Sequence, residues 1–258
     1  MTKDRLRLRV GVMLLALGLA TSPLRAEEVD LELVLAVDAS GSVDETEFQL
    51  QLQGIAEAFR DEAVQSAIAS GPNGRIAVAL IVWADATMPK DESPWFVLGD
   101  RASALSFADA VGQFPRRVEG GTGIGAAVAY AVRLIADNRF TAPRRVVDVS
   151  GDGIETPARE DLTILLPQAR VMASAHDVVV NGLAIINEVH DLDRYYRENV
   201  IIGHDSFVMK SVNYEDFREA IRSKLLREIS ARIALLAPTE RHRASPAFDI
   251  APSRTLLP

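Results

Sequence analysis

The sequence contains no cysteine among its 258 residues. This absence excludes disulfide bonds, thiolate catalysis, Cys-based zinc sites and lipid attachment to a cysteine. Basic residues are also in deficit, since 28 Lys and Arg stand against 36 Asp and Glu, for a net charge of -8. Nucleic acids and anionic membrane surfaces are bound by basic surfaces. We therefore expect neither nucleic-acid binding nor polybasic membrane association.

The sequence also lacks long apolar runs, and even the apolar run near the N-terminus is short. Lys3, Arg5, Arg7 and Arg9 precede an apolar run of eleven residues, Val10 to Ala20, which is too short to span a bilayer comfortably. Ala26 then offers a cleavage point before two acidic residues. We predict a signal peptide over residues 1–26 and a periplasmic or secreted mature protein without stable membrane insertion; the alternative is an uncleaved anchor.

The chain as a whole has an ordinary globular composition, with 48% hydrophobic and 25% charged residues. Its periodicity alternates between short apolar runs and amphipathic segments. The expected strands are 31–37, 76–83, 95–98, 145–149, 178–185 and 207–212. The expected helices begin near residue 44 and near residue 214, and otherwise span 103–114, 125–137 and 159–175. From Pro238 onward the periodicity ends, so we predict a disordered tail over residues 237–258.

This alternation predicts an α/β fold with a doubly wound, mostly parallel central sheet and helices on both faces. The connection between residues 84 and 94 is too short for a crossover helix. The strand 95–98 is therefore expected as an antiparallel edge strand. In such sheets, sites form beyond the carboxyl ends of the strands.

Three polar clusters lie at or near such positions. Asp38-Ala39-Ser40-Gly41-Ser42 follows the first strand, and Ser150-Gly151-Asp152-Gly153 follows the strand 145–149. Thr122 lies in a Gly-rich loop before a helix. The candidate ligands are all hard oxygen donors: Asp38, Ser40, Ser42, Thr122 and Asp152. Oxygen-only ligation suits Mg²⁺, Mn²⁺ or Ca²⁺ rather than Zn²⁺ or copper.

Two of the clusters also have a plainer interpretation when taken alone. The first resembles a turn with a helix cap, and Thr122 resembles a cap of the helix after it; only the combination favours a metal. A Walker loop is excluded because no Gly-Lys-Ser/Thr triplet exists. His176, His190, His204 and His242 are scattered and are interpreted as surface residues. Asp85 could border the site or lie in a solvated turn.

The three clusters together resemble the metal-ion-dependent adhesion site of von Willebrand factor A domains, over residues 29–236. A bacterial family of exported domains of this type also has a third loop reading Ser-Gly-Asp-Gly. Here Gly151 departs from the commoner Thr-Asp-Gly pattern, and Asp148 is an unexpected charge within a strand. The resemblance implies that Ser40 and Ser42 ligate the metal directly, and that Thr122 and the two Asp bind directly or through water.

The resemblance further implies that a carboxylate of a protein or peptide partner completes the metal coordination. The leading hypothesis is therefore a binding module and not an enzyme. A metal-dependent hydrolase using the same cation is the alternative, and a structural role for the metal is a third. Three segments should form the rim of the contact: 84–94, 154–160 and 186–205. In the last of these, Arg194 and Tyr195 suit an interface, whereas Tyr195 and Tyr196 could equally be packed within the loop.

Overall fold

The computed structural model describes residues 26–156, 158 and 163–236. The predicted signal peptide, apart from Ala26, and the predicted tail lie outside these residues. No described helix has the length and apolar character needed to cross a membrane.

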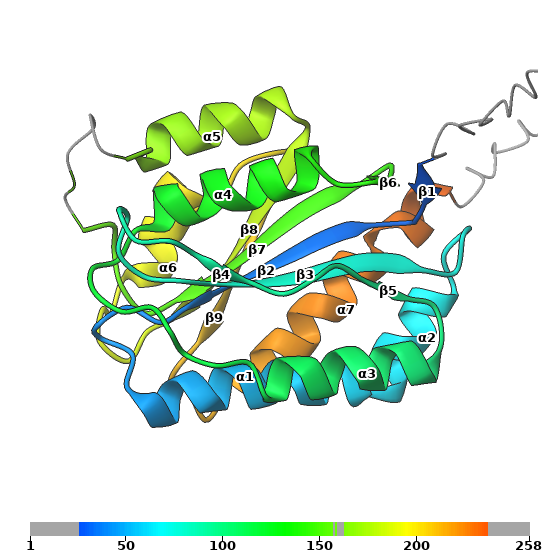
Figure 1. Ribbon diagram of the computed structural model, residues 1–258, viewed down its shortest axis with the longest axis horizontal. Helices are drawn as coiled ribbons and strands as arrows, with labels where there is room; N and C mark the ends of the chain where they lie inside the picture. Colours follow the sequence, from blue (N-terminus) through cyan, green and yellow to red (C-terminus); the bar gives the residue numbers. More distant parts are fainter. Residues whose placement is uncertain (1–25, 157, 159–162, 237–258) are drawn as a thin grey trace, which may run out of the picture.

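A seven-stranded sheet forms the centre of the molecule (Figure 1). The order is β4-β3-β2-β7-β8-β9, and β5 also pairs with β3. The strands are β2 (Glu32–Asp38), β3 (Ile76–Trp83), β4 (Asp91–Glu92), β5 (Phe96–Leu98), β7 (Arg145–Gly151), β8 (Val178–Ile185) and β9 (Val208–Ser211). Two short strands, β1 (Glu27–Glu28) and β6 (Phe140–Thr141), pair separately.

The pairing confirms the predicted topology. β2, β3, β7, β8 and β9 run parallel to their neighbours, and β4 and β5 pair antiparallel with β3. The antiparallel edge is therefore divided into two short pieces along β3. Because the central strands are parallel, their carboxyl ends meet at one edge of the sheet.

Helices cover both faces of the sheet, as predicted (Figure 1). One face carries α1 (Glu45–Arg60), α2 (Glu62–Ala69), α3 (Arg101–Gly112) and α7 (Phe217–Leu236). The other carries α4 (Ile124–Ala136), α5 (Leu166–Ala175), α6 (Leu192–Tyr195) and a π-helical turn, η1 (Tyr196–Val200).

Successive side chains of each strand point to opposite faces of the sheet and pack against different helices. In β2, Leu33, Leu35 and Val37 pack toward the α1 face, and Val34 and Ala36 pack toward the α4 face. Burial on both faces explains why the strand reads as a continuous apolar run. This double packing fixes where β2 ends, and therefore where Asp38 lies.

The helix predicted over 159–175 is wrong at its start. Residues 163–165 are not helical, and α5 begins only at Leu166, while residues 159–162 lie outside the described chain. Pro167 occupies the first turn of α5, the one helical position where proline is well tolerated. The helices α2 and α6 and the turn η1 were not predicted, because they are short and lack a clear apolar stripe.

The unexpected Asp148 of β7 belongs to a buried charge network that ties α7 to the sheet. Lys224 Nζ of α7 lies 2.7 Å from Asp148 Oδ1 and 2.6 Å from Glu228 Oε1. Asn181 of β8 donates from Nδ2 to Glu228 Oε1 at 2.7 Å. All four side chains are buried. Two carboxylates therefore share one ammonium group inside the core.

Candidate metal centre

The end of β2 places Asp38 at the carboxyl edge of the sheet. The backbone N–H of Ser40 donates to Asp38 Oδ1 at 2.7 Å and turns the chain toward α1. The neighbouring strand β7 ends at Gly151, so Asp152 emerges beside the same loop. The Ser42 hydroxyl donates to Asp152 Oδ1 at 2.6 Å and lies 3.4 Å from the Ser40 hydroxyl. Four of the five predicted side chains thus form one cluster.

Thr122 reaches the cluster from the loop before α4. The backbone N–H of Gly41 donates to the Gly120 carbonyl at 2.8 Å, which joins this loop to the first one. Thr122 Oγ1 lies 3.2 Å from the point where a Cβ on Gly153 would stand. At Gly123 a Cβ would lie 2.5 Å from the backbone nitrogen of Ala86, so only glycine allows this close approach to the end of β3.

The cluster has a buried acidic side and an open hydroxyl side. Asp38, Ser40 and Asp152 are buried, whereas Ser42 is exposed and Thr122 is half-buried. The Oδ2 atoms of Asp38 and Asp152 are buried without a hydrogen-bond partner. Burial, and then the charge of Asp152, raise the pKa of Asp38 to about 7. Two close, unsatisfied carboxylates are costly unless a cation neutralises them.

The donor set fits a hard divalent cation. Two carboxylates and three hydroxyls supply oxygen only, which suits Mg²⁺, Mn²⁺ or Ca²⁺. Among the described residues, no three His, Cys, Asp or Glu side chains group together as a metal site. The cluster differs from such a group because most of its donors are hydroxyls. The role of the five residues as metal ligands remains a prediction.

Two tyrosines that the sequence did not assign to the site lie beneath its carboxylates. The Tyr196 hydroxyl is buried, and a Cβ on Gly151 would stand 2.6 Å from Asp38 Oδ2 and 2.9 Å from this hydroxyl. Burial and the charges of Asp38 and Asp152 raise the pKa of Tyr196. Burial and the charge of Asp152 likewise raise the pKa of Tyr214. Gly151 is thus required by the tight space between Asp38 and Tyr196.

Two further side chains hold the first loop in place. Arg116 donates to the carbonyls of Ala39, Ser40 and Val43, the last at 2.7 Å. Gln51 Nε2 donates to the Asp38 carbonyl at 2.9 Å. Gln51 is a buried polar residue on the apolar face of α1. A polar residue on this face is the one sequence signal that could have indicated its role at the site. Arg116 has no comparable signal.

The remaining candidates fall into two groups. Asp85 borders the Thr122 loop: its Oδ2 lies 3.2 Å from where a Cβ on Gly121 would stand, and its Oδ1 accepts from Thr87. The other residues lie apart from the cluster. His176, His190 and His204 are exposed, and His242 lies outside the described residues.

The Tyr195–Tyr196 pair is packed within the fold. Tyr196 is buried, and the half-buried Tyr195 accepts a hydrogen bond at its hydroxyl from the Glu155 backbone at 3.2 Å. Arg194 is exposed and pairs with Glu198 at 2.8 Å. Of these three, Arg194 alone is exposed, and its guanidinium is engaged by Glu198.

A known family model matches most of the chain. The family model described as "Protein of unknown function (DUF1194)" matches residues 28–233. The chain belongs to this family. No match is found among curated proteins. The residues matched by the DUF1194 model include the whole central sheet and every predicted site residue.

Solved structures show that the fold is that of a von Willebrand A domain. Proximal thread matrix protein 1 of the mussel byssus, in a structure described with a zinc-occupied metal-ion-dependent adhesion site, aligns with a TM-score of 0.55 and 16% identity. That alignment covers 80% of this chain and 46% of the mussel chain. The von Willebrand domain of the pilus tip protein Mfa5 from Porphyromonas gingivalis gives a TM-score of 0.50 and 11% identity. It covers 80% of this chain and 96% of that domain.

The pilus adhesin SpaC from Lactobacillus rhamnosus GG also aligns, with a TM-score of 0.54 and 11% identity. That alignment covers 81% of this chain and 32% of SpaC. The DUF1194 chain therefore spans less than half of the mussel protein and about a third of SpaC. At these identities the likeness extends to the fold alone.

Proposed function

We propose that this protein is an exported divalent-metal-binding module that recognises a protein or peptide partner through a carboxylate. The observation that carries the proposal is the pair of buried carboxylates, Asp38 and Asp152, each with an unpartnered oxygen, beneath an exposed hydroxyl. A bound divalent cation would be held by these two residues with Ser40, Ser42 and Thr122. It would supply an electrophilic centre for an outside oxygen.

The asymmetry of the cluster supports binding of an anion from outside. The carboxylates lie on the protein side, and Ser42 faces solvent. Neutral hydroxyls leave the charge of a cation largely uncancelled on this open side, which favours an incoming carboxylate. The metal-occupied site of the mussel protein, and the adhesin named among the similar structures, agree with this proposal.

We propose binding rather than catalysis at this site. A hydrolase needs a general base that is free to accept a proton. Of the acids near the cluster, Glu47 accepts from the Asp44 backbone at 2.8 Å as part of the capping box of α1. Within the described residues, the histidines are exposed and lie elsewhere. Export to the periplasm or beyond is part of the proposal and is based on the N-terminal segment.

Metal binding is tested by calorimetry with Mg²⁺ and Mn²⁺. We expect Asp38→Ala or Asp152→Ala to weaken binding by more than about 100-fold, because each removes a charged donor from a site in which even outer-shell changes cost 10–100-fold. The matched control is Asp109→Ala, since Asp109 is an exposed carboxylate paired with Arg60 on another face. Unchanged affinity in both site variants would refute the assignment.

Recognition is tested by metal-dependent capture. Immobilised protein should retain a partner from the periplasmic or external fraction in Mg²⁺, release it in chelator, and release it when a short aspartate-containing peptide competes. Capture that is equal in chelator would contradict carboxylate recognition even if the metal binds. Hydrolysis of ester or phosphoester probes that requires Asp38 would favour the hydrolase alternative.

A further inference from the structure

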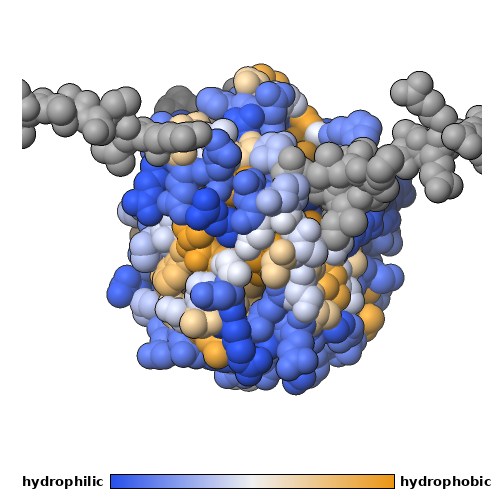
Figure 2. All heavy atoms as spheres, turned by 90° about the vertical axis from the view of Figure 1, so that its right-hand side faces the viewer, coloured by the Kyte–Doolittle hydropathy of each residue, from blue (hydrophilic) through white to orange (hydrophobic). Residues whose placement is uncertain are grey.

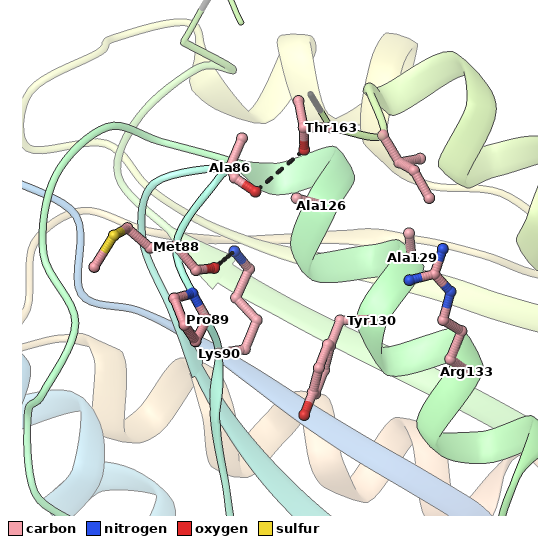
Figure 3. Close-up of a pocket in the computed structure, with 10 residues that line it drawn as sticks. Ala86, Met88, Pro89, Lys90, Ala126, Ala129, Tyr130, Arg133 and Thr163 are labelled. Carbon is pink, nitrogen blue, oxygen red and sulfur yellow. Dashed lines mark hydrogen bonds between the residues drawn. The ribbon is translucent and has the colours of Figure 1, made fainter. Parts of the chain in front are cut away.

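A pocket of about 320 Å³ adjoins the candidate metal centre (Figure 3). One wall is the segment after β3, from Ala86 to Lys90, and the opposite wall is one face of α4. The Ala86 carbonyl accepts a hydrogen bond from Thr163 Oγ1 at 3.1 Å, which closes the upper end. Because Gly123 donates to the Ala84 carbonyl at 2.9 Å, the pocket shares its wall with the loop that carries Thr122.

Two cations line this pocket from opposite sides (Figure 3). Lys90 is half-buried, and its Nζ donates to the carbonyls of Asp85 and Met88 at 2.8 and 2.7 Å. Arg133 is exposed on α4. Over residues 26–156, 158 and 163–236, neither cation forms a salt bridge with an acidic side chain. The charge of Asp85 acts on Lys90 without a direct ion pair, so the pocket presents two cations in a chain of net charge -8.

The α4 wall of the pocket leaves room for a side chain between these cations. Ala126, Ala129, Tyr130 and Arg133 fall at i, i+3, i+4 and i+7 along α4 and therefore share one face. The two alanines project little, so the space above them is open. The backbone carbonyls fix Lys90 in advance, which lowers the entropic cost of pairing it with an anion.

We propose that this pocket is a second recognition subsite, which takes an acidic side chain of the same partner whose first carboxylate meets the metal centre. The inference rests on the proposed function and specifies the chemistry of the partner. The partner is a protein segment with two acidic residues. One pairs with the metal centre and the other with Lys90 and Arg133 through charge-assisted hydrogen bonds.

The fold also sets the spacing between the two acids. Ala129, near the middle of the α4 wall of the pocket, lies seven residues after Thr122, or about 10.5 Å at the rise of an α-helix. An extended peptide advances roughly 3.3 Å per residue. The second acid should therefore follow or precede the first by three or four residues.

The test uses fluorescent Gly/Ser peptides with one aspartate, or with two aspartates separated by two to six positions. Anisotropy in saturating Mn²⁺ should show metal-dependent binding of the one-acid peptide. A second acid at a separation of three or four should tighten binding about tenfold, since the second contact is intramolecular. Replacing the second aspartate by asparagine should remove the gain, and added salt should reduce it.

The variants separate the subsite from the metal centre. Lys90→Gln with Arg133→Gln should abolish the gain from the second acid and leave the one-acid peptide unaffected. The matched control is Arg101→Gln, an exposed arginine of α3 on the other face of the sheet. If the double variant keeps the gain, or if no spacing produces one, the subsite is wrong while the proposed function stands. If the one-acid peptide shows no metal-dependent binding, the proposed function fails and the subsite fails with it.

Discussion

Gly151 shows how a single residue is constrained by the site around it. A Cβ at this position would stand within 2.6 Å of Asp38 Oδ2 and 2.9 Å of the Tyr196 hydroxyl. Both neighbours are buried and cannot swing aside. The departure from the commoner loop pattern is therefore explained by the crowding of Asp38 and the Tyr196 hydroxyl around this position.

Gly151→Ala should push the Asp38 carboxylate out of place and weaken Mn²⁺ binding by more than about tenfold, as displaced ligands do. Calorimetry measures the affinity, and circular dichroism confirms the fold. Gly112→Ala is the control, because its Cβ would meet Ala56 at an ordinary 3.8 Å. Parental affinity in Gly151→Ala would show that the carboxylate is not held as tightly as its contacts indicate.

At the scale of elements, the loops of the site are joined by contacts between distant segments. Arg116, in the connection from α3 to α4, bonds three carbonyls of the loop after β2. Gln51 of α1 bonds the last carbonyl of β2 and receives the Ser150 hydroxyl at 3.3 Å. The loops therefore form one preorganised unit, and this rigidity favours tight metal binding.

The attachment of α7 to the sheet depends on the charge network of Asp148, Lys224 and Glu228. Lys224→Met leaves two buried carboxylates without a cation, and breaking such a network costs roughly 3–5 kcal/mol. In a domain of this size, the melting temperature should fall by roughly 10 °C. Asp148→Asn is the matched variant, because Lys224 keeps Glu228 as its partner and the melting temperature should change much less.

The parent protein and the Asp148→Asn variant should also differ in how their stability depends on pH. Burial raises the pKa of Asp148 from 3.8 to about 7. A carboxyl group with a raised pKa binds its proton more tightly in the folded protein than in the unfolded protein. The stability that this proton contributes is therefore present below pH 4 and is lost as pH rises through about 7. Denaturant unfolding between pH 4 and 8 should therefore show the parent losing stability relative to Asp148→Asn. A difference that stays constant with pH would contradict this interpretation.

At the scale of the whole molecule, the two ends of the sheet differ in character. The candidate site lies where β2 ends and the chain turns into α1 (Figure 1). The opposite end, where β2 begins, shows mainly hydrophilic residues around a smaller apolar area (Figure 2). The unpartnered carboxylate oxygens of Asp38 and Asp152 lie at the carboxyl end of the sheet, so a cation bound there would stabilise the folded domain.

Metal at about 100 times its dissociation constant should stabilise the folded chain by about 2.7 kcal/mol. For a domain of this size, this corresponds to a rise in melting temperature of roughly 5–10 °C. Scanning calorimetry in Mg²⁺ or Mn²⁺ against chelator measures the rise. Asp38→Asn should show none; an equal rise in that variant would place the bound metal elsewhere.

The sequence by itself predicted a mostly parallel sheet with helices on both faces, its antiparallel edge strand, and five candidate oxygen donors at or near the ends of strands. It could do so because apolar periodicity is local, and because parallel strands bring the residues after them to one edge. The strand 76–83 and the strand 178–185 were predicted at their observed bounds. The start of α5 and the short helices α2 and α6 were missed, since their signals are weak within a short window.

Only the tertiary structure decided which residues support that site. Arg116 and Tyr196 reach it from segments dozens of residues away, and Gln51 reaches it from α1. Their roles depend on burial and on distances that no spacing encodes. Asp148 looked anomalous within its strand until α7 placed Lys224 against it. Secondary-structure propensity depends on residues that are neighbours along the chain. Hydrogen bonding and desolvation depend on which residues are brought together by tertiary packing.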